Sequence, residues 1–179
     1  MGPLSPEPWP GFVRLSGASS DHDVALVVAR LARYGHGGGG PQSLKGLAAD
    51  FPRVTPGGLA AAGRLTVVYP SCCCGLEAWR DWYQLLSDGQ SPWLGHDPSP
   101  WVEVRGEEFL VWPDGDVGEA NEGDAQPIRF SKPELVASLA SAERDLGAFA
   151  DRLRDWASTR APEHAQALCD RFRALVSLT

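Results

Sequence analysis

The segment from Thr55 to Trp112 constrains the fold most, because it concentrates the large apolar side chains of the chain. It holds five of the seven tryptophans and three of the four cysteines. Turns rich in Gly and Pro divide it into short pieces with alternating strand-like and helix-like patterns. Tryptophans bury large areas, so we expect this segment to form the core. It contains neither a phosphate-binding loop nor spaced cysteine pairs, so it indicates an architecture more readily than a reaction.

Length and charge narrow the class of protein. A chain of 179 residues with 43% hydrophobic and 22% charged residues is typical of one soluble globular domain, so we expect a single domain over residues 1–179. The formal charge of −7 argues against a nucleic-acid or anionic-membrane partner, which needs a basic surface, and allows a basic protein partner. No apolar run approaches the roughly 18 residues of a membrane span.

The N-terminal residues indicate the compartment. Residues 1–10 contain four prolines and no positively charged or apolar leader, so we expect a flexible arm and no export signal. A chain without an export signal is expected in the cytoplasm, where its four cysteines stay reduced. The cytoplasm is therefore the predicted location.

Local patterns predict an α+β fold. Ser19–Asp21 offers N-cap residues for a first helix, and the β-branched run LTVVY is typical of a strand. The predicted strands cover residues 12–15, 65–69, 101–104, 108–112 and 128–130, and the predicted helices before the C-terminal region cover residues 23–34, 43–51 and 76–86. The strands at 101–104 and 108–112 are expected to form a hairpin.

The C-terminal third predicts a helical hairpin over residues 131–179. Ser131 is a natural N-cap, and Glu134 stands at the capping-box position. Apolar residues then recur at alternating steps of four and three until Ala161–Pro162, where a second helix begins. We therefore expect a small, mostly antiparallel sheet with helices on one side and a C-terminal helical hairpin. The apolar seam is more typical of internal packing than of a homodimer surface, which stays an alternative.

Three consecutive cysteines and a nearby histidine are the first candidate for chemistry. A zinc site needs cysteines spaced so that their sulfur atoms converge, whereas Cys72, Cys73 and Cys74 are expected to point in different directions. We therefore expect small buried thiols, with no metal and no cofactor. The alternative is a cysteine-dependent enzyme in which His96 is the base and Asp97 orients it. Asp97 before a proline is equally typical of a turn.

An acidic stretch is the second candidate. Residues 103–124 contain eight acidic residues and only one basic residue, Arg105. The stretch is interpreted either as a solvated loop or as a docking face for a basic protein, flanked by tryptophan anchors. The candidate partner-binding residues are Trp93, Glu107, Glu108, Trp112, Asp114 and Asp116.

The order of these elements resembles the SUKH superfamily. The features concerned are the Pro56-Gly57-Gly58 turn before a strand, a Trp-bearing helix, a hairpin that ends in Val111-Trp112-Pro113-Asp114, and Phe130-Ser131 before a final helix. The resemblance covers residues 44–139. It implies an α+β binding protein of the bacterial toxin-immunity type, without catalysis, that blocks a basic toxin domain.

Together these patterns favour a protein-binding protein over an enzyme. The leading hypothesis is an immunity protein that occludes a basic toxin domain. One alternative is the cysteine-dependent enzyme with Cys72–Cys74 and His96, and another is a self-associating scaffold or accessory protein of a bacterial pathway.

Overall fold

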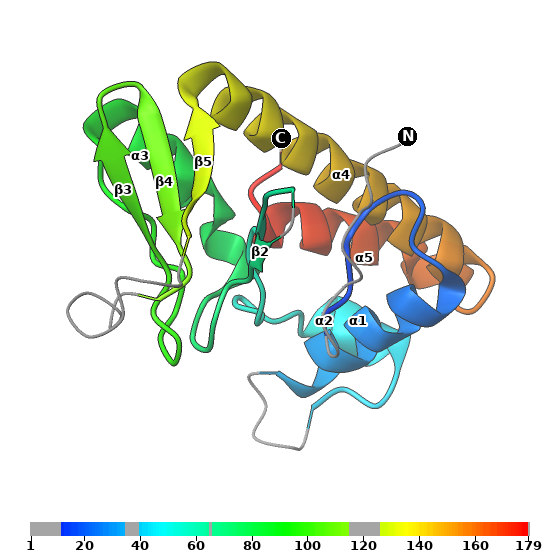
Figure 1. The fold of residues 1–179 in the computed structure, drawn as a ribbon. Helices are drawn as coiled ribbons and strands as arrows, with labels where there is room; N and C mark the ends of the chain where they lie inside the picture. Colours follow the sequence, from blue (N-terminus) through cyan, green and yellow to red (C-terminus); the bar gives the residue numbers. More distant parts are fainter. Residues whose placement is uncertain (1–11, 35–39, 65, 115–125, 179) are drawn as a thin grey trace. The chain divides into compact units, whose positions relative to one another are not determined.

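The computed structural model describes residues 12–34, 40–64, 66–114 and 126–178. The chain forms two compact units. The sheet unit consists of the described residues within 56–140, and the helical unit consists of those within 12–55 and 141–178. Helix α4 (Lys132–Ser158) begins in the sheet unit and continues into the helical unit (Figure 1). The fold is of the α+β class, as predicted.

A three-stranded antiparallel sheet organises the sheet unit (Figure 1). Its strands are β3 (Trp101–Arg105), β4 (Glu108–Trp112) and β5 (Ile128–Ser131), with β4 in the middle. The predicted hairpin is confirmed, since Trp101 pairs with Trp112 and Arg105 with Glu108 across a turn at Gly106. The strand predicted at 128–130 is confirmed as β5, which pairs with β4.

The inner face of this sheet carries the core of the unit. Side chains alternate between the two faces of a strand, so Val102, Val111 and Ile128, which pair in register, share one face. They are buried in a cluster with residues of helix α3 (Asp81–Asp88) and of the first turns of α4, namely Trp82, Leu85, Leu135 and Leu139. The prediction of a core in the tryptophan-rich segment is therefore confirmed for the sheet unit, although Trp93 and Trp101 of that segment are exposed.

Short elements complete the sheet unit. Strand β1 (Ala61–Ala62) pairs with β2 (Val67–Val68) in a separate two-stranded antiparallel sheet. Strand β2 lies within the predicted strand at 65–69 and is shorter than it. The helix predicted at 76–86 consists of a 3₁₀ helix, η1 (Leu76–Arg80), followed directly by α3. Helix α3 ends at Gly89, whose left-handed backbone makes it a typical C-terminal cap.

Helix α4 begins where the sequence predicts. The Ser131 hydroxyl accepts from the Glu134 amide at 3.5 Å, and the Glu134 carboxylate accepts from the Ser131 amide at 2.8 Å. This reciprocal pair satisfies two amides that helix geometry leaves without partners. It also fixes the junction between β5 and α4.

The helical unit is built from α1 (Asp21–Arg33), α2 (Leu44–Ala49), the rest of α4 and α5 (Pro162–Leu175). Ser20 and Asp23 form a second capping box at the start of α1. The seam of the predicted C-terminal hairpin is internal, because the rings of Phe149 and Phe172 lie 5.1 Å apart and are fully buried. The packing interpretation of the apolar seam is thus confirmed for these residues.

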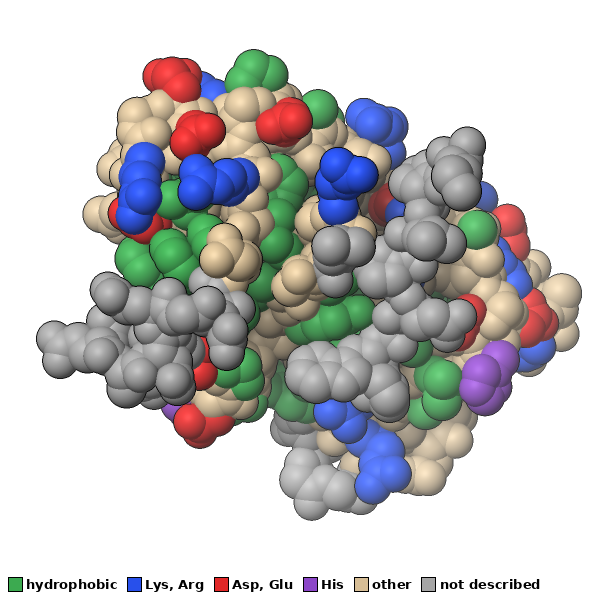
Figure 2. All heavy atoms as spheres, in the orientation of Figure 1, with side chains coloured by type: hydrophobic (Ala, Val, Ile, Leu, Met, Phe, Trp, Pro, Cys, Tyr) green, Lys and Arg blue, Asp and Glu red, His purple; other side chains and the backbone are tan. Residues whose placement is uncertain are grey.

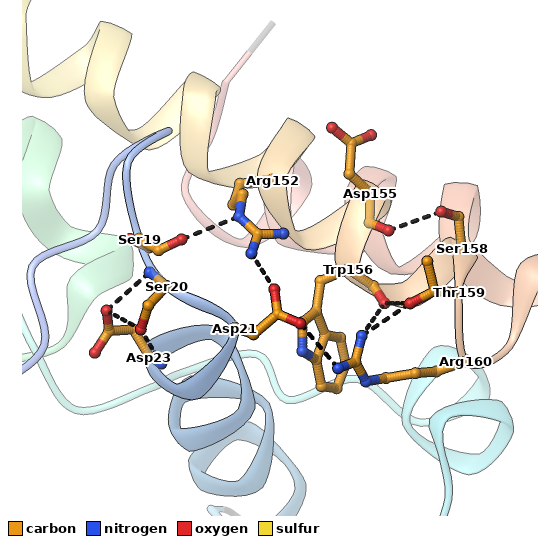
Figure 3. Close-up of polar contacts among 10 residues, drawn as sticks. All are labelled: Ser19, Ser20, Asp21, Asp23, Arg152, Asp155, Trp156, Ser158, Thr159 and Arg160. Atoms are coloured by element: carbon orange, nitrogen blue, oxygen red, sulfur yellow. Dashed lines mark hydrogen bonds and ion pairs between the residues drawn. The ribbon is translucent and has the colours of Figure 1, made fainter.

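One carboxylate connects α1 to the C-terminal helices within the helical unit (Figure 3). Asp21 pairs with Arg152 of α4 and, at 3.0 Å, with Arg160 in the turn before α5. The Arg160 guanidinium also lies over the ring of Trp156, 4.3 Å from its centroid. Hydrogen bonds from Arg152 and Arg160 lower the pKa of Asp21.

Some predictions differ from the structure or lie outside it. Residues 12–15 form no strand, so that prediction is wrong. The predicted arm at 1–10 and the candidate residue Asp116 lie outside the described residues. A single domain stays a prediction, with two compact units described.

Candidate functional site

Two loops of the sheet unit, residues 71–74 and 94–97, are bound to each other through their backbones. The Ser71 amide donates to Leu94 O at 2.7 Å, and the His96 amide donates to Cys72 O at 3.2 Å. The Ser71 hydroxyl adds a bond to His96 O at 2.6 Å. Cys72 and His96 therefore stand opposite each other in an antiparallel bridge.

Gly95 permits this close approach. Its φ is +97°, and a Cβ at this position would lie 2.4 Å from Cys72 O and 2.7 Å from Ser71 C. A side chain would therefore collide with backbone atoms that cannot swing aside. The glycine before His96 is thus required for the two loops to meet.

The bridge brings thiol and imidazole groups together at the surface. Cys72 Sγ lies 3.1 Å from His96 Nδ1. The ligand atoms of Cys72, Cys73 and His96 all lie within 4.8 Å of one another, and all three residues are exposed. The expectation that the side chains of neighbouring cysteines would point in different directions is wrong for Cys72 and Cys73. Cys73 has a φ of +62°, and this left-handed backbone departs from the strand geometry that points successive side chains to opposite faces.

The third thiol is separate from this cluster. Cys74 is buried, and its thiol donates to Trp93 O at 3.5 Å. Burial, with the charges of Glu77 and Asp81, raises the pKa of Cys74 to about 11, so this thiol stays protonated at neutral pH. The prediction of buried thiols is confirmed for Cys74 and wrong for Cys72 and Cys73, which are exposed; the fourth cysteine, Cys169, is also buried.

Asp97 is not a member of this cluster, but its negative charge acts on Cys73. Loss of hydration raises the pKa of the Cys73 thiol most, followed by its hydrogen bond with Cys72, the charge of Cys72 and the charge of Asp97. The predicted catalytic set is therefore only partly assembled. The contact between Cys72 and His96 is present, whereas among the described residues Asp97 makes no hydrogen bond to His96 that would orient the imidazole.

An open depression lies beside the cluster. Its volume is about 370 Å³, and it is lined by Ser91, Pro92, Trp93, Gly95, Ser99, Pro100 and Trp101. Trp93 is 57% exposed, and its indole N–H donates to Cys73 O at 3.2 Å. This bond fixes a large aromatic ring at the surface between the depression and the thiols.

The outer face of the β3–β5 sheet is polar and aromatic. By register its exposed and half-buried positions are Trp101, Glu103, Arg105, Glu108, Trp112 and Arg129, and Leu110 between them is fully buried. The rings of Trp101 and Trp112 stack 6.4 Å apart at 13°, and the Trp112 indole donates to Glu103 at 3.0 Å. Arg105 pairs with Glu103 at 2.6 Å. Figure 2 shows basic side chains beside acidic ones over the region that Figure 1 labels β3 to β5.

The predicted partner-binding residues have different surroundings. Trp93 and Glu107 are exposed, whereas Glu108 is exposed but pairs with Arg129 at 3.5 Å. Trp112 is half-buried in the stack, and Asp114 accepts from the Ser99 amide at 3.1 Å. Trp93 and Glu107 thus keep the exposure that their predicted roles need, and Trp112 and Asp114 also hold the local structure.

Of two further contributors, the sequence reasoning counted Trp101 only among the flanking tryptophans and missed Arg129. Trp101 is 40% exposed and lines the depression with Trp93, and Arg129 neutralises Glu108 from the neighbouring strand. The strand alternation of residues 101–105 hinted at the exposure of Trp101. The Arg129 pairing depends on the β4–β5 register, which no local signal encodes.

The negative charge of the protein is unevenly distributed along the chain. Residues 56–140 contain thirteen acidic and five basic residues, a formal charge of −8, whereas the rest contains ten acidic and eleven basic residues, a charge of +1. Five of those thirteen acids fall within residues 114–124, where there is no basic residue. The segment that forms the sheet unit therefore carries all of the net charge.

Comparison of the chain with family models, curated proteins and solved structures found no match. Within the described residues, every helix is too short or too polar to cross a lipid bilayer.

Proposed function

We propose that this chain is a protein-binding protein that contacts a basic partner through Trp93, Trp101 and the outer face of the β3–β5 sheet. The observation that carries the proposal is the pair of exposed tryptophans on one open depression, within a segment whose formal charge is −8. Tryptophans that are held rigidly at a surface are typical energetic anchors of protein interfaces. Excess negative charge accelerates encounter with a basic surface.

The proposed surface combines a rigid tryptophan with nearby negative charges. Trp93 is fixed by its bond to Cys73 O, so little side-chain entropy remains to be lost on binding. The ion pairs of Glu103 and Glu108 with arginines lower their value as attractive charges, so attraction falls to Glu107 and the acids of residues 114–124. The resemblance to the SUKH superfamily supports a toxin-immunity role in a bacterial cytoplasm, with a basic toxin domain as the partner.

The proposal is tested on a partner captured at low salt on the immobilised chain and then purified. We expect Trp93→Ala to weaken the measured affinity about thirtyfold or more, as at an interface hot spot. We expect the triple variant Glu107→Lys, Asp116→Lys and Glu119→Lys mainly to slow association and to flatten its salt dependence.

Leu26→Ala is the matched control, because Leu26 is an exposed apolar residue (46%) on α1, outside the proposed surface. This change should leave affinity unchanged. A captured protein whose affinity is unaffected by both the Trp93 variant and the triple variant would contradict the proposal. Light scattering on the free chain tests the self-association alternative, which requires a dimer or larger species.

The cysteine-dependent enzyme is a second candidate, favoured by the 3.1 Å contact between Cys72 Sγ and His96 Nδ1. A base at this distance is the arrangement that activates a thiol nucleophile. Neither residue lines the 370 Å³ depression, so the pair has no enclosed substrate site there. Rapid alkylation of Cys72 at neutral pH that His96→Ala abolishes would favour this candidate, and slow, uniform labelling would dismiss it.

A further inference from the structure

We propose that Cys72, Cys73 and His96 form a binding site for a thiophilic divalent metal ion, with zinc as the expected occupant. Two thiolates and one imidazole are soft and borderline donors of the kind that select zinc over magnesium or calcium. This inference does not depend on the proposed partner binding, since its three ligand residues are not among the proposed contact residues and it is tested without a partner.

The distances are already close to those of a coordinated ion. In a tetrahedral zinc site with bonds of about 2.3 Å to sulfur and 2.0–2.1 Å to nitrogen, neighbouring ligand atoms lie roughly 3.6–3.8 Å apart. Cys72 Sγ and His96 Nδ1 lie 3.1 Å apart, and every ligand pair of the cluster lies within 4.8 Å. Rotations of the side chains that shift the ligand atoms by about an ångström would complete the geometry.

The backbone holds these ligands in place before any ion arrives. Two amide–carbonyl bonds and the Ser71 hydroxyl tie the loop of Cys72 to the loop of His96. The Trp93 indole N–H holds Cys73 O at 3.2 Å. Such supporting bonds orient ligand side chains, and their loss typically weakens metal affinity.

The number and identity of the ligands in the cluster also suit a zinc ion. Cys74, the remaining neighbour, is directed to Trp93 O and is not a member. Three protein ligands leave the fourth tetrahedral position for water, the coordination typical of zinc sites that exchange ligands.

The test uses the full, reduced chain and zinc itself. Zinc affinity is measured by competition with a chromogenic chelator, and Co²⁺ is added in parallel so that its visible ligand-field bands report geometry and thiolate ligation. We expect one ion per chain, tetrahedral Co²⁺ bands with thiolate charge transfer, and a monomer before and after loading. Cys72→Ser, Cys73→Ser and His96→Ala should each weaken affinity about tenfold or more.

Cys74→Ala is the matched control, because it removes the adjacent thiol and should leave zinc affinity unchanged. As a measurement that needs no variant, zinc should slow alkylation of Cys72 and Cys73 in the native chain, as mapped by mass spectrometry, and leave Cys169 unaffected. Affinity that is insensitive to all three ligand variants, octahedral Co²⁺ bands or no protection of the two thiols would overturn the proposal. None of these results bears on partner affinity, so the two proposals fail separately.

Discussion

Gly95 is the residue on which the meeting of Cys72 and His96 depends. We predict that Gly95→Ala lowers the free energy of unfolding by about 3 kcal/mol, because a left-handed backbone costs an L-residue about 1–2 kcal/mol and the new Cβ adds a backbone clash. The clash is defined by the 2.4 Å approach to Cys72 O. Urea unfolding followed by tryptophan fluorescence measures the change.

Gly106 provides the control for this prediction. Its φ is +62°, but a Cβ there would meet no atom within 4 Å. Gly106→Ala should therefore cost only the conformational part, about 1–2 kcal/mol. Equal losses at Gly95 and Gly106 would show that the contact between the two loops is not the source of the effect.

At the scale of the element, the start of α4 depends on one reciprocal pair of hydrogen bonds. We predict that Ser131→Ala lowers the unfolding free energy by about 1 kcal/mol at neutral pH, the usual cost of losing an N-cap. Hydrogen bonds from the Ser131 side chain and backbone lower the pKa of Glu134 below its ordinary value of 4.5. Circular dichroism during urea unfolding measures the loss.

The pH dependence of the same cap has a defined sign. A carboxyl group with a lowered pKa in the folded state stabilises the protein above its ordinary pKa, and this contribution disappears as the pH falls through the lowered value. Glu134→Gln should therefore destabilise the protein at pH 7 and lose its effect below pH 4.5. A destabilisation that stays constant down to pH 2–3 (roughly two units below that ordinary value) would contradict the charged capping interaction.

At the scale of the whole molecule, Asp21 joins the first helix to residues more than a hundred positions later (Figure 3). We predict that Asp21→Asn lowers the unfolding free energy at neutral pH and that the loss shrinks in high salt, because exposed ion pairs are screened. The pKa of Asp21 is lowered from 3.8, so the difference from the parent should also vanish as the pH falls below that value. Thermal and urea unfolding at several salt concentrations measure this.

Asp155→Asn is the control for the Asp21 prediction. Asp155 pairs at 3.5 Å with Arg154, its neighbour on the same helix, so its loss disconnects no distant segments. It should change stability little. An equal effect of the two substitutions would show that the contacts of Asp21 with Arg152 and Arg160 add no stability beyond that of a local surface pair.

Much of the architecture could be predicted because its signals are local. Ser131 with Glu134 and Ser20 with Asp23 mark helix starts within one turn, and the alternation of residues 101–112 marks a hairpin closed by a short turn. The prediction failed at residues 12–15, where no strand forms, and it did not resolve the separation into two small sheets. Strand pairing depends on distant partners, so short apolar runs alone do not specify it.

The sequence by itself determined where helices begin, that the tryptophan-rich segment forms a core and that the net charge is negative, because these depend on neighbouring residues or on composition. Only the tertiary structure placed His96 against Cys72, twenty-four positions earlier, and Arg129 beside Glu108. It also turned Cys73 into a left-handed conformation beside Cys72. These contacts follow from backbone bonds between distant loops and from strand register, which packing of the whole chain decides.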